Sequence, residues 1–310
     1  MAEERGHSAR DMQSLFIRDP LLGWVPNPGF RSPHLSYDAK GTRAQPALAA
    51  DGGPPLLTTG NSYGEGEDVA DDETWPVILQ ALLGRRTVNA GVGGYGLDQV
   101  VLRTEQLAAS LRPAAIVASF IADDVRRNEM HYLWGAEKAY FTLERDGSLV
   151  LRNVPVPESA IADDRLSFWQ RAFGWSALVE LTVRRVSEGD EWITGNRRAT
   201  PADTGEQLAC PLMRRLASLG VPTLVVAQYE STAWLHNAAR RNEQRRLSRL
   251  VLDCAASAAL ATLDTFNAIA QVARAGGLLD LYVNNHHSAE GNRLVAETIA
   301  AELKRRGMLP

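Results

Sequence analysis

The feature that most constrains how this chain can fold is an alternation of short apolar runs with amphipathic segments, which begins at residue 55. Residues 114–121 are apolar on both faces, as expected for a parallel strand that is covered on both sides. The other strand-like runs are residues 55–59, 86–89, 222–228 and 259–266, and the segments with helical spacing are residues 73–83, 97–111, 205–219, 238–261 and 289–305. Repeated β-α units predict an α/β fold, a three-layer α/β/α sandwich with a mainly parallel central sheet.

Two regions lie outside this alternation. Residues 1–50 contain an apolar run at 21–26 and predict a Pro-rich arm packed on a body of residues 51–310; the prolines are Pro20, Pro26, Pro28, Pro33 and Pro46. Residues 125–200, approximately, predict an insertion over one end of the sheet. Within it, residues 140–151 predict a hairpin around Asp146-Gly147, residues 168–186 an aromatic-rich helix and residues 190–203 a polar loop.

The composition of the chain indicates which binding partners and which cellular compartment to expect. The chain has 310 residues and a net charge of −4, which favours neither nucleic acid nor an anionic membrane as a partner. Its two cysteines, Cys210 and Cys254, lie in separate helical patterns without metal-ligand spacing, and they imply no disulfide framework. The N-terminus has no apolar run of signal-peptide length, and no apolar stretch is as long as a membrane span. These observations predict a cytoplasmic protein.

The first strand-like run ends in a turn that contains a serine between small residues, Gly60-Asn61-Ser62-Tyr63-Gly64. A serine at this boundary can be held with its hydroxyl exposed and a backbone N–H beside it, which suits a nucleophile. The turn also matches Gly-x-Ser-x-Gly of the α/β-hydrolases, but in those enzymes several strands precede the serine. Gly, Asn and Ser are also ordinary turn residues, so a plain strand-turn-helix connection is the alternative.

A glycine-rich block follows the second strand-like run. It contains Gly91-x-Gly93-x-x-Gly96, the dinucleotide-binding spacing, and Asp123 after the next strand is a candidate ribose-binding acid. The block follows the second strand rather than the first, which weakens that interpretation. Glycines here can equally present a backbone N–H to a substrate oxyanion.

Two adjacent histidines precede the last helix. His286 and His287 are candidates for a general base, because histidine titrates near neutral pH. An isolated pair at a helix entry would more often be a surface feature. The spacing of five residues to Gly291 favours His286 as the base and leaves His287 open.

These blocks, in this order, resemble the SGNH hydrolases, the GDSL-type esterases and lipases, over residues 55–305, with a flavodoxin-like fold. Gly60-Asn61-Ser62 stands for Gly-Asp-Ser, residues 89–94 match the Asn-x-Gly block, residues 121–124 replace Gly-x-Asn-Asp, and His286 precedes Gly291 as the family histidine does. Residues 64–76 and 89–99 also resemble a bacterial subgroup with divergent blocks.

The resemblance implies a serine-dependent hydrolase of short-chain acyl or acetyl esters, on a small molecule, a saccharide or a secondary metabolite. Ser62 would attack the acyl carbon to form an acyl-enzyme, and His286 would transfer the proton. The oxyanion would be held by the N–H groups of Ser62 and Gly94 and by the side chain of Asp123. Neither a metal nor an organic cofactor is implied.

Three positions differ from the family pattern. Asn61 replaces Asp and is expected to keep the turn hydrogen bonds, whereas Asp123 replaces the oxyanion-hole Asn, and an ionised carboxylate cannot donate. Asn284 stands where the acid that orients the histidine is expected, and it could orient the ring through its carbonyl oxygen. Asp280 and Asp264 are the alternatives for this role.

Other functions remain open at this stage. The aromatic residues of the insertion could exclude water and favour acyl transfer to an alcohol or a sugar, or they could simply pack; they are Trp134, Tyr140, Phe141, Trp169 and Trp175. The three departures also fit an inactive fold that is used as a carbohydrate-binding or assembly module.

Overall fold

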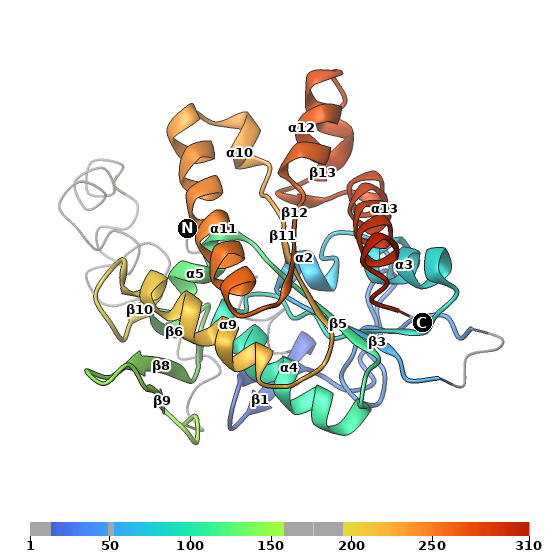
Figure 1. Cartoon of the computed structure of the whole chain (residues 1–310). Coiled ribbons are helices and arrows are strands. Elements are labelled where there is room, and N and C mark those ends of the chain that lie inside the picture. The colour runs from blue at the N-terminus through green and yellow to red at the C-terminus, as the bar shows by residue number, and fades with distance from the viewer. Residues whose placement is uncertain (1–13, 49–52, 158–175, 177–194, 310) are drawn as a thin grey trace.

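In the computed structural model, which describes residues 14–48, 53–157, 176 and 195–309, a five-stranded sheet lies at the centre (Figure 1). The strand order is β12-β11-β5-β3-β4, and every neighbouring pair is parallel. The strands are β3 (Leu56–Thr59), β4 (Thr87–Asn89), β5 (Ala115–Phe120), β11 (Thr223–Ala227) and β12 (Ala261–Asp264). The predicted parallel sheet is confirmed, because buried runs apolar on both faces need cover on both sides.

Helices cover both faces of this sheet. The long helices are α3 (Trp75–Leu83), α4 (Leu97–Leu111), α9 (Ala209–Ala217), α11 (Ala238–Ser257) and α13 (Ala289–Arg306). Leu56, Val117 and Val226 point to the face that α3 and α13 cover. The alternate positions Leu57, Ile116 and Val225 point to the face that α4, α9 and α11 cover. Two cores separated by a sheet form the predicted α/β/α sandwich, and Figure 1 shows the two helix layers.

Further helices, turns of 3-10 helix and strands lie between these elements. They are α2 (Ser62–Glu65), η1 (Asp71–Glu73), α5 (Ala122–Arg127), η3 (Thr204–Leu208), α10 (Thr232–Leu235), α12 (Phe266–Arg274), η4 (Leu279–Leu281), β13 (Tyr282–Val283) and β14 (His286–His287). The pattern predicted α4 with its observed bounds. It did not predict α12 or the antiparallel β13–β14 hairpin, which holds both histidines.

The strand order changes direction between β3 and β5. The chain enters the sheet at β3, continues to β4 on one side, and then crosses to β5 on the other side. The loops after β3 and β5 therefore leave the sheet in opposite directions, and the carboxyl ends of such strands are where α/β proteins bind ligands. Ser62 lies at this point.

The N-terminal segment begins with an antiparallel hairpin, β1 (Phe16–Asp19) and β2 (Gly23–Pro26), that packs against the body. Trp24 is buried, and its Nε1 donates to the carbonyl oxygen of Gly93 at 3.0 Å. The hydroxyl of Tyr95 donates to the carbonyl oxygen of Trp24 at 2.6 Å. The hairpin is therefore bonded directly to the glycine-rich block.

The region between α5 and α9 forms small antiparallel sheets. β6 (Met130–Leu133) pairs with β7 (Ala136–Glu137) and with β10 (Arg197–Arg198), and β8 (Tyr140–Leu143) pairs with β9 (Leu149–Arg152). The predicted hairpin around Asp146-Gly147 is confirmed. The predicted helix at 168–186, with Trp169 and Trp175, and residues 190–194 of the predicted loop lie outside the described residues.

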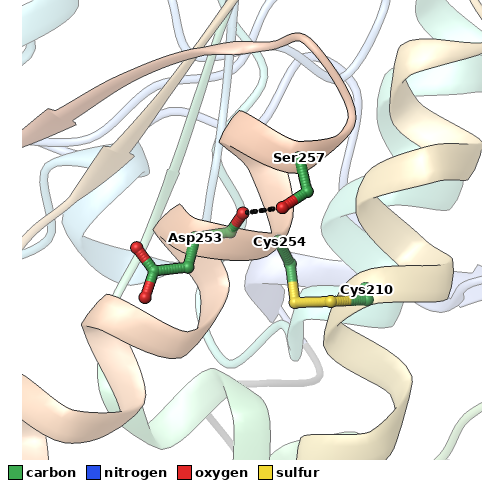
Figure 2. The surroundings of a disulfide bond; sticks show 4 residues. All are labelled: Cys210, Asp253, Cys254 and Ser257. Carbon is green, nitrogen blue, oxygen red and sulfur yellow. Dashed lines mark hydrogen bonds between the residues drawn. A yellow bond between two sulfur atoms is a disulfide. The ribbon is translucent and has the colours of Figure 1, made fainter.

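Cys210 and Cys254 form a disulfide between α9 and α11 (Figure 2). The two cysteines were expected to form no disulfide, and this was wrong, because two helices packed on one sheet face bring cysteines 44 residues apart to a Cα–Cα distance of 4.6 Å. Disulfides persist in oxidising environments. The two cysteines therefore no longer support a cytoplasmic location. Of the helices in the described residues, none is both long and apolar enough to cross a bilayer.

The hairpin contact yields a stability prediction. Trp24→Ala should lower the free energy of unfolding by about 3–5 kcal/mol, since it empties a buried indole site and removes a hydrogen bond. Guanidinium denaturation followed by circular dichroism measures the change. Ile17→Ala, at a position 41% exposed on the same hairpin, is the matched control and should shift it by less than about 0.5 kcal/mol. Equal effects of the two substitutions would contradict the packing.

Candidate active site

Ser62 is the first residue of α2, directly after the turn that ends β3. The turn is tight because a Cβ at Gly60 would lie 2.3 Å from the hydroxyl oxygen of Ser119, so a larger residue cannot occupy this position without displacing β5. Ser62 itself is buried, at 5% exposure. The close packing of β3 on β5 thus fixes the backbone that carries the serine.

The hydroxyl of Ser62 lies beside the imidazole of His286. The Ser62 Oγ–His286 Nε2 distance is 2.9 Å, and His286 Nδ1 lies 2.8 Å from Asp68 Oδ2. A carboxylate can only accept a hydrogen bond, so the contact with Asp68 places a proton on Nδ1 of neutral His286. Nε2 is then the acceptor for the hydroxyl proton of Ser62. The three side chains form a serine-histidine-aspartate relay.

The acid of this relay is not the residue that the sequence pattern indicated. Asn284, the candidate orienting residue, donates its Nδ2 to Asp68 Oδ1 at 3.1 Å and thus supports the acid rather than the histidine. Both residues have left-handed backbone conformations, with φ of 70° at Asp68 and 52° at Asn284. Asp and Asn tolerate this conformation better than most residues. Two loops therefore meet with their polar side chains facing each other.

Asp68 was missed because no local pattern connects it to His286. It lies six positions after Ser62, whereas its contact with His286 spans 218 residues of sequence. The acidic pair Glu67-Asp68 beside the nucleophile turn was the available signal. Glu67 is half exposed, and its Oε2 lies 3.8 Å from His286 Nε2, so a second carboxylate borders the relay.

His286 and His287 have opposite environments. His287 is buried at 2% exposure, and within the described residues neither ring nitrogen has a hydrogen-bond partner. Burial, together with the nearby His286, lowers the pKa of His287 from 6.5 to about 3. The His287 ring packs against Tyr63 and Tyr282, with ring centroids 5.0 Å apart in each pair. His287 is therefore a neutral core residue, and the contact with Ser62 belongs to His286.

The hairpin that carries His286 is held from two sides. The Tyr63 hydroxyl donates to the carbonyl oxygen of Asn285, and the Tyr63 ring lies 5.1 Å from that of His286. On the other side, the Ser231 hydroxyl donates to Asn285 Oδ1 at 2.6 Å. These contacts fix the register of His286 opposite Ser62.

Asn61 makes the turn hydrogen bonds expected of it. Its Oδ1 accepts from the backbone N–H of Tyr63 at 2.8 Å, and its Nδ2 donates to both oxygens of Asp124 at 2.7 Å. Asp124 is fully buried, and burial raises its pKa to about 7, although Arg127 and Asn61 oppose the shift. An Asp at position 61 would place a second carboxylate against that of Asp124, which explains why this position holds an Asn.

The glycine-rich block packs beside the nucleophile turn. Gly94 has a φ of 83°, and a Cβ there would lie 2.1 Å from Cζ3 of Trp134, so only glycine fits. Among the described residues, no acceptor occupies the backbone N–H of Ser62 or Gly94. Both groups are free to donate to a substrate oxygen. The preceding N–H, that of Gly93, donates to Glu65 Oε2 at 2.8 Å and anchors the loop.

Other N–H groups of this block are already occupied, which argues against dinucleotide binding. Gly91 donates to Asn89 Oδ1 and Val92 to the carbonyl oxygen of Gly60, in addition to the Gly93 bond. A phosphate cradle needs several free N–H groups in succession. Asp123, the candidate ribose acid, is in an ion pair instead.

Asp123 does not provide the donor expected of the oxyanion hole. Its Oδ2 accepts from Arg127, at 3.1 Å from Nε and 2.9 Å from Nη2. A carboxylate in an ion pair with a guanidinium is an acceptor only. The third position of the expected oxyanion hole is thus an Arg127–Asp123 ion pair. No cluster of three or more His, Cys, Asp or Glu in the described ranges is suited to a metal ion.

Comparison with known proteins identifies the fold. No family model and no curated protein sequence matches the chain. Among solved structures, Axe2, an acetylxylan esterase from Geobacillus stearothermophilus, is 14% identical with a TM-score of 0.50, covering 81% of this chain and 94% of that one. TesA is 14% identical over 82% of this chain and 99% of its own, with a TM-score of 0.47. A putative lipolytic protein of the G-D-S-L family from Desulfitobacterium hafniense DCB-2 is 12% identical over 81% and 100%, with a TM-score of 0.46.

The chain has the α/β fold of the SGNH, or GDSL-type, esterases. At these identities the likeness concerns the fold alone, and the chemistry has to be argued from the residues of this chain.

The environment of His287 can be tested directly. We expect its Cε1 proton resonance to stay constant between pH 8 and 5, because its pKa is about 3. Proton NMR titration measures this, and the spectrum of His287→Gln assigns the resonance. Since the unfolded chain protonates this histidine near pH 6.5, stability falls as the pH drops from 6.5 towards 3. A titration midpoint of His287 near 6.5 would contradict the assignment.

Proposed function

We propose that this protein is a serine-dependent esterase that hydrolyses a carboxylic ester through an acyl-enzyme. The observation that carries the proposal is the relay in which Ser62 Oγ lies 2.9 Å from His286 Nε2 and His286 Nδ1 lies 2.8 Å from Asp68. A serine hydroxyl is a weak nucleophile unless a base accepts its proton, and the base needs a fixed tautomer. The two contacts of His286 support both requirements.

The first half of the reaction forms the acyl-enzyme. Ser62 Oγ attacks the ester carbonyl carbon while His286 Nε2 takes the hydroxyl proton, and Asp68 stabilises the resulting imidazolium. The backbone N–H groups of Ser62 and Gly94 donate to the carbonyl oxygen as it becomes an oxyanion. Collapse of this intermediate expels the alcohol, which receives its proton from His286.

The second half releases the acid. Water attacks the acyl carbon, His286 takes a proton from that water, and the tetrahedral intermediate expels Ser62, which regains a proton from His286. The water can be replaced by an alcohol, so the same relay supports acyl transfer. The half-exposed indole of Trp134 beside Gly94 is the residue that would border such an acceptor.

We expect short acyl groups, because the side chains round the nucleophile are close-packed. Ser62 and Tyr63 are buried, and the ring of Trp134 covers Gly94. Acetyl esters of a small molecule or a saccharide are the substrates that this space suits. The acetylxylan esterase activity of Axe2 supports the choice by analogy of fold only.

One prediction of this mechanism concerns the nucleophile. Ser62→Ala should lower kcat for p-nitrophenyl acetate by at least about 10³-fold, because the covalent step is lost. A fluorophosphonate probe should label the wild-type protein at Ser62 and should not label the variant. Product analysis with an added alcohol separates hydrolysis from transfer. Equal rates of the two proteins would rule out the proposed function.

Another prediction of this mechanism concerns the acid. Asp68→Asn should lower kcat by about 10⁴-fold, because an amide no longer fixes the tautomer of His286. Asp280→Asn is the matched control: the same chemical change, at an exposed acid once considered for this role, should alter the rate by less than about twofold. A loss at Asp280 comparable to that at Asp68 would reject the assignment of the acid.

A further inference from the structure

The loop that carries Asp68 has few backbone hydrogen bonds of its own. The N–H groups of Gly66 and Glu67 both donate to the carbonyl oxygen of Ser62, at 2.9 and 3.0 Å. Asp68 itself makes no backbone hydrogen bond within the described residues, and its φ is 70°. A residue keeps such a conformation only when the surrounding structure holds it there. The position of Asp68 opposite His286 therefore depends on contacts that its neighbours in the loop make with other parts of the chain.

Arg43, in the N-terminal segment, makes these contacts. Its Nη1 donates to the carbonyl oxygens of Glu65 and Gly66, at 3.1 and 2.5 Å. Its Nη2 donates to the carbonyl oxygen of Val69 at 2.6 Å. Val69 directly follows Asp68, and Gly66 lies two positions before it. One planar guanidinium therefore binds the loop backbone on both sides of the acid.

Every N–H group of this guanidinium has an acceptor. Nη2 also donates to the carbonyl oxygen of His34 at 3.1 Å, and Nε donates to Asp71 Oδ1 at 2.9 Å. A guanidinium has five N–H groups in a fixed fork, so these contacts together use all of them. Arg43 is buried at 2% exposure, where an N–H without an acceptor would be costly. The acceptors are thus held in a fixed arrangement around one rigid group.

The backbone of Arg43 is attached to the edge of the central sheet. Its N–H donates to the carbonyl oxygen of Asn89, the last residue of β4, at 2.9 Å. The side chain of Asn89 donates to the carbonyl oxygen of Glu65 at 3.0 Å, which is the oxygen that also accepts from Arg43. The sheet therefore fixes Arg43, and the side chain of Arg43 in turn fixes the loop.

We propose that Arg43 is a positioning residue, which keeps Asp68 in contact with His286 by binding the carbonyl oxygens on both sides of that acid. A lysine could not do the same, because its ammonium presents all its donors from one atom and lacks the planar fork. The inference rests on the proposed function where it concerns turnover. The contact between Asp68 and His286 that it explains is a property of the structure itself.

The tautomer of His286 is a readout that a role of Arg43 in stability alone would not move. In the wild-type protein, neutral His286 should carry its proton on Nδ1, as the bond to Asp68 requires. Arg43→Lys should lower the ratio of the Nδ1–H to the Nε2–H tautomer by about tenfold, because a hydrogen bond to a charged group is weakened. Nitrogen-15 NMR of the histidine rings above neutral pH measures this ratio, and the spectrum of His286→Gln assigns the resonances. An unchanged ratio in a variant that circular dichroism shows to be folded overturns the proposal.

Arg103→Lys is the matched control. Arg103 is also buried, at 4% exposure, and its Nη2 donates to the carbonyl oxygen of Gly41 at 2.7 Å, two positions before Arg43. Among the described residues it has no hydrogen bond or ion pair with residues 65–71. The same substitution here should leave both the tautomer ratio and kcat unchanged. Equal effects of the two substitutions would mean that packing of the N-terminal segment, and not Arg43, sets the tautomer.

Kinetics provide a second readout. Arg43→Lys should lower kcat for p-nitrophenyl acetate by about 10²-fold and change KM by less than about threefold, because a displaced acid acts on the transition state and not on substrate binding. In an Asp68→Asn background the same substitution should lower kcat by less than about threefold, since the group that Arg43 positions is already lost. A further loss of about 10²-fold in that background would show that Arg43 does not act through Asp68.

Asp71→Ala keeps the proposal testable if Arg43→Lys does not fold. It removes the only carboxylate that pairs with Arg43 in the described part of the chain, at a side chain that is 28% exposed. The tautomer ratio of His286 should fall by about threefold, because one of the bonds that orient the guanidinium is lost. Asp72→Ala, at the exposed neighbouring position, is the control and should leave the ratio unchanged. No change with Asp71→Ala would overturn the role of Arg43.

The proposed function and this inference can fail separately. If Ser62→Ala abolishes hydrolysis and Arg43→Lys leaves the tautomer ratio unchanged, only the role of Arg43 is wrong. If Ser62→Ala leaves the rate unchanged while Arg43→Lys shifts the ratio, the proposed function is wrong, and Arg43 positions Asp68 without a consequence for turnover. Loss of activity with Ser62→Ala, together with a shifted tautomer and a lowered kcat in Arg43→Lys, supports both.

Discussion

The buried carboxylate of Asp124 is the constraint on which the arrangement of the site depends. A charge without solvent contact requires donors, and Asp124 receives them from Asn61, from the backbone N–H of Ile121 and from Arg127. Asn61 and Ile121 lie in the turns that follow the neighbouring strands β3 and β5, so satisfying one buried group joins both turns. The position of Ser62 follows directly, because it is the next residue after Asn61.

Two of the three side chains of the relay lie close together in the sequence. Ser62 and Asp68, the proposed nucleophile and acid, lie six positions apart, and only His286 comes from a distant part of the chain. The contacts of the β13–β14 hairpin with Tyr63 place His286 beside the other two side chains. Asn284 reinforces the same junction by donating to Asp68. The second histidine of the hairpin, His287, is buried and packs the hairpin against the core.

The glycine-rich loop beside Ser62 is held by contacts with the N-terminal segment. Trp24 donates to Gly93, and Glu65 accepts from the N–H of the same residue. Burial raises the pKa of Glu65 to about 7, although the bond from Tyr37 opposes the shift. Residues that precede the sheet in sequence thus hold the loop beside Gly94, which makes the N-terminal hairpin part of the site's support rather than a separate appendage.

Local pattern determined much of this protein. Apolar runs and helical spacing predicted the parallel sheet and the bounds of α4, because burial on one or both faces leaves a period in the sequence. Motif spacing nominated Ser62, which follows the predicted strand β3, and His286, which precedes the predicted helix α13 but lies in a hairpin that the pattern did not predict. The acid Asp68, the Cys210–Cys254 bond and the Arg127–Asp123 pair were decided by tertiary structure. The first two join residues 218 and 44 positions apart, where no periodicity applies. The third is local in sequence, but only folding brings Trp134 and the Gly94 loop against it.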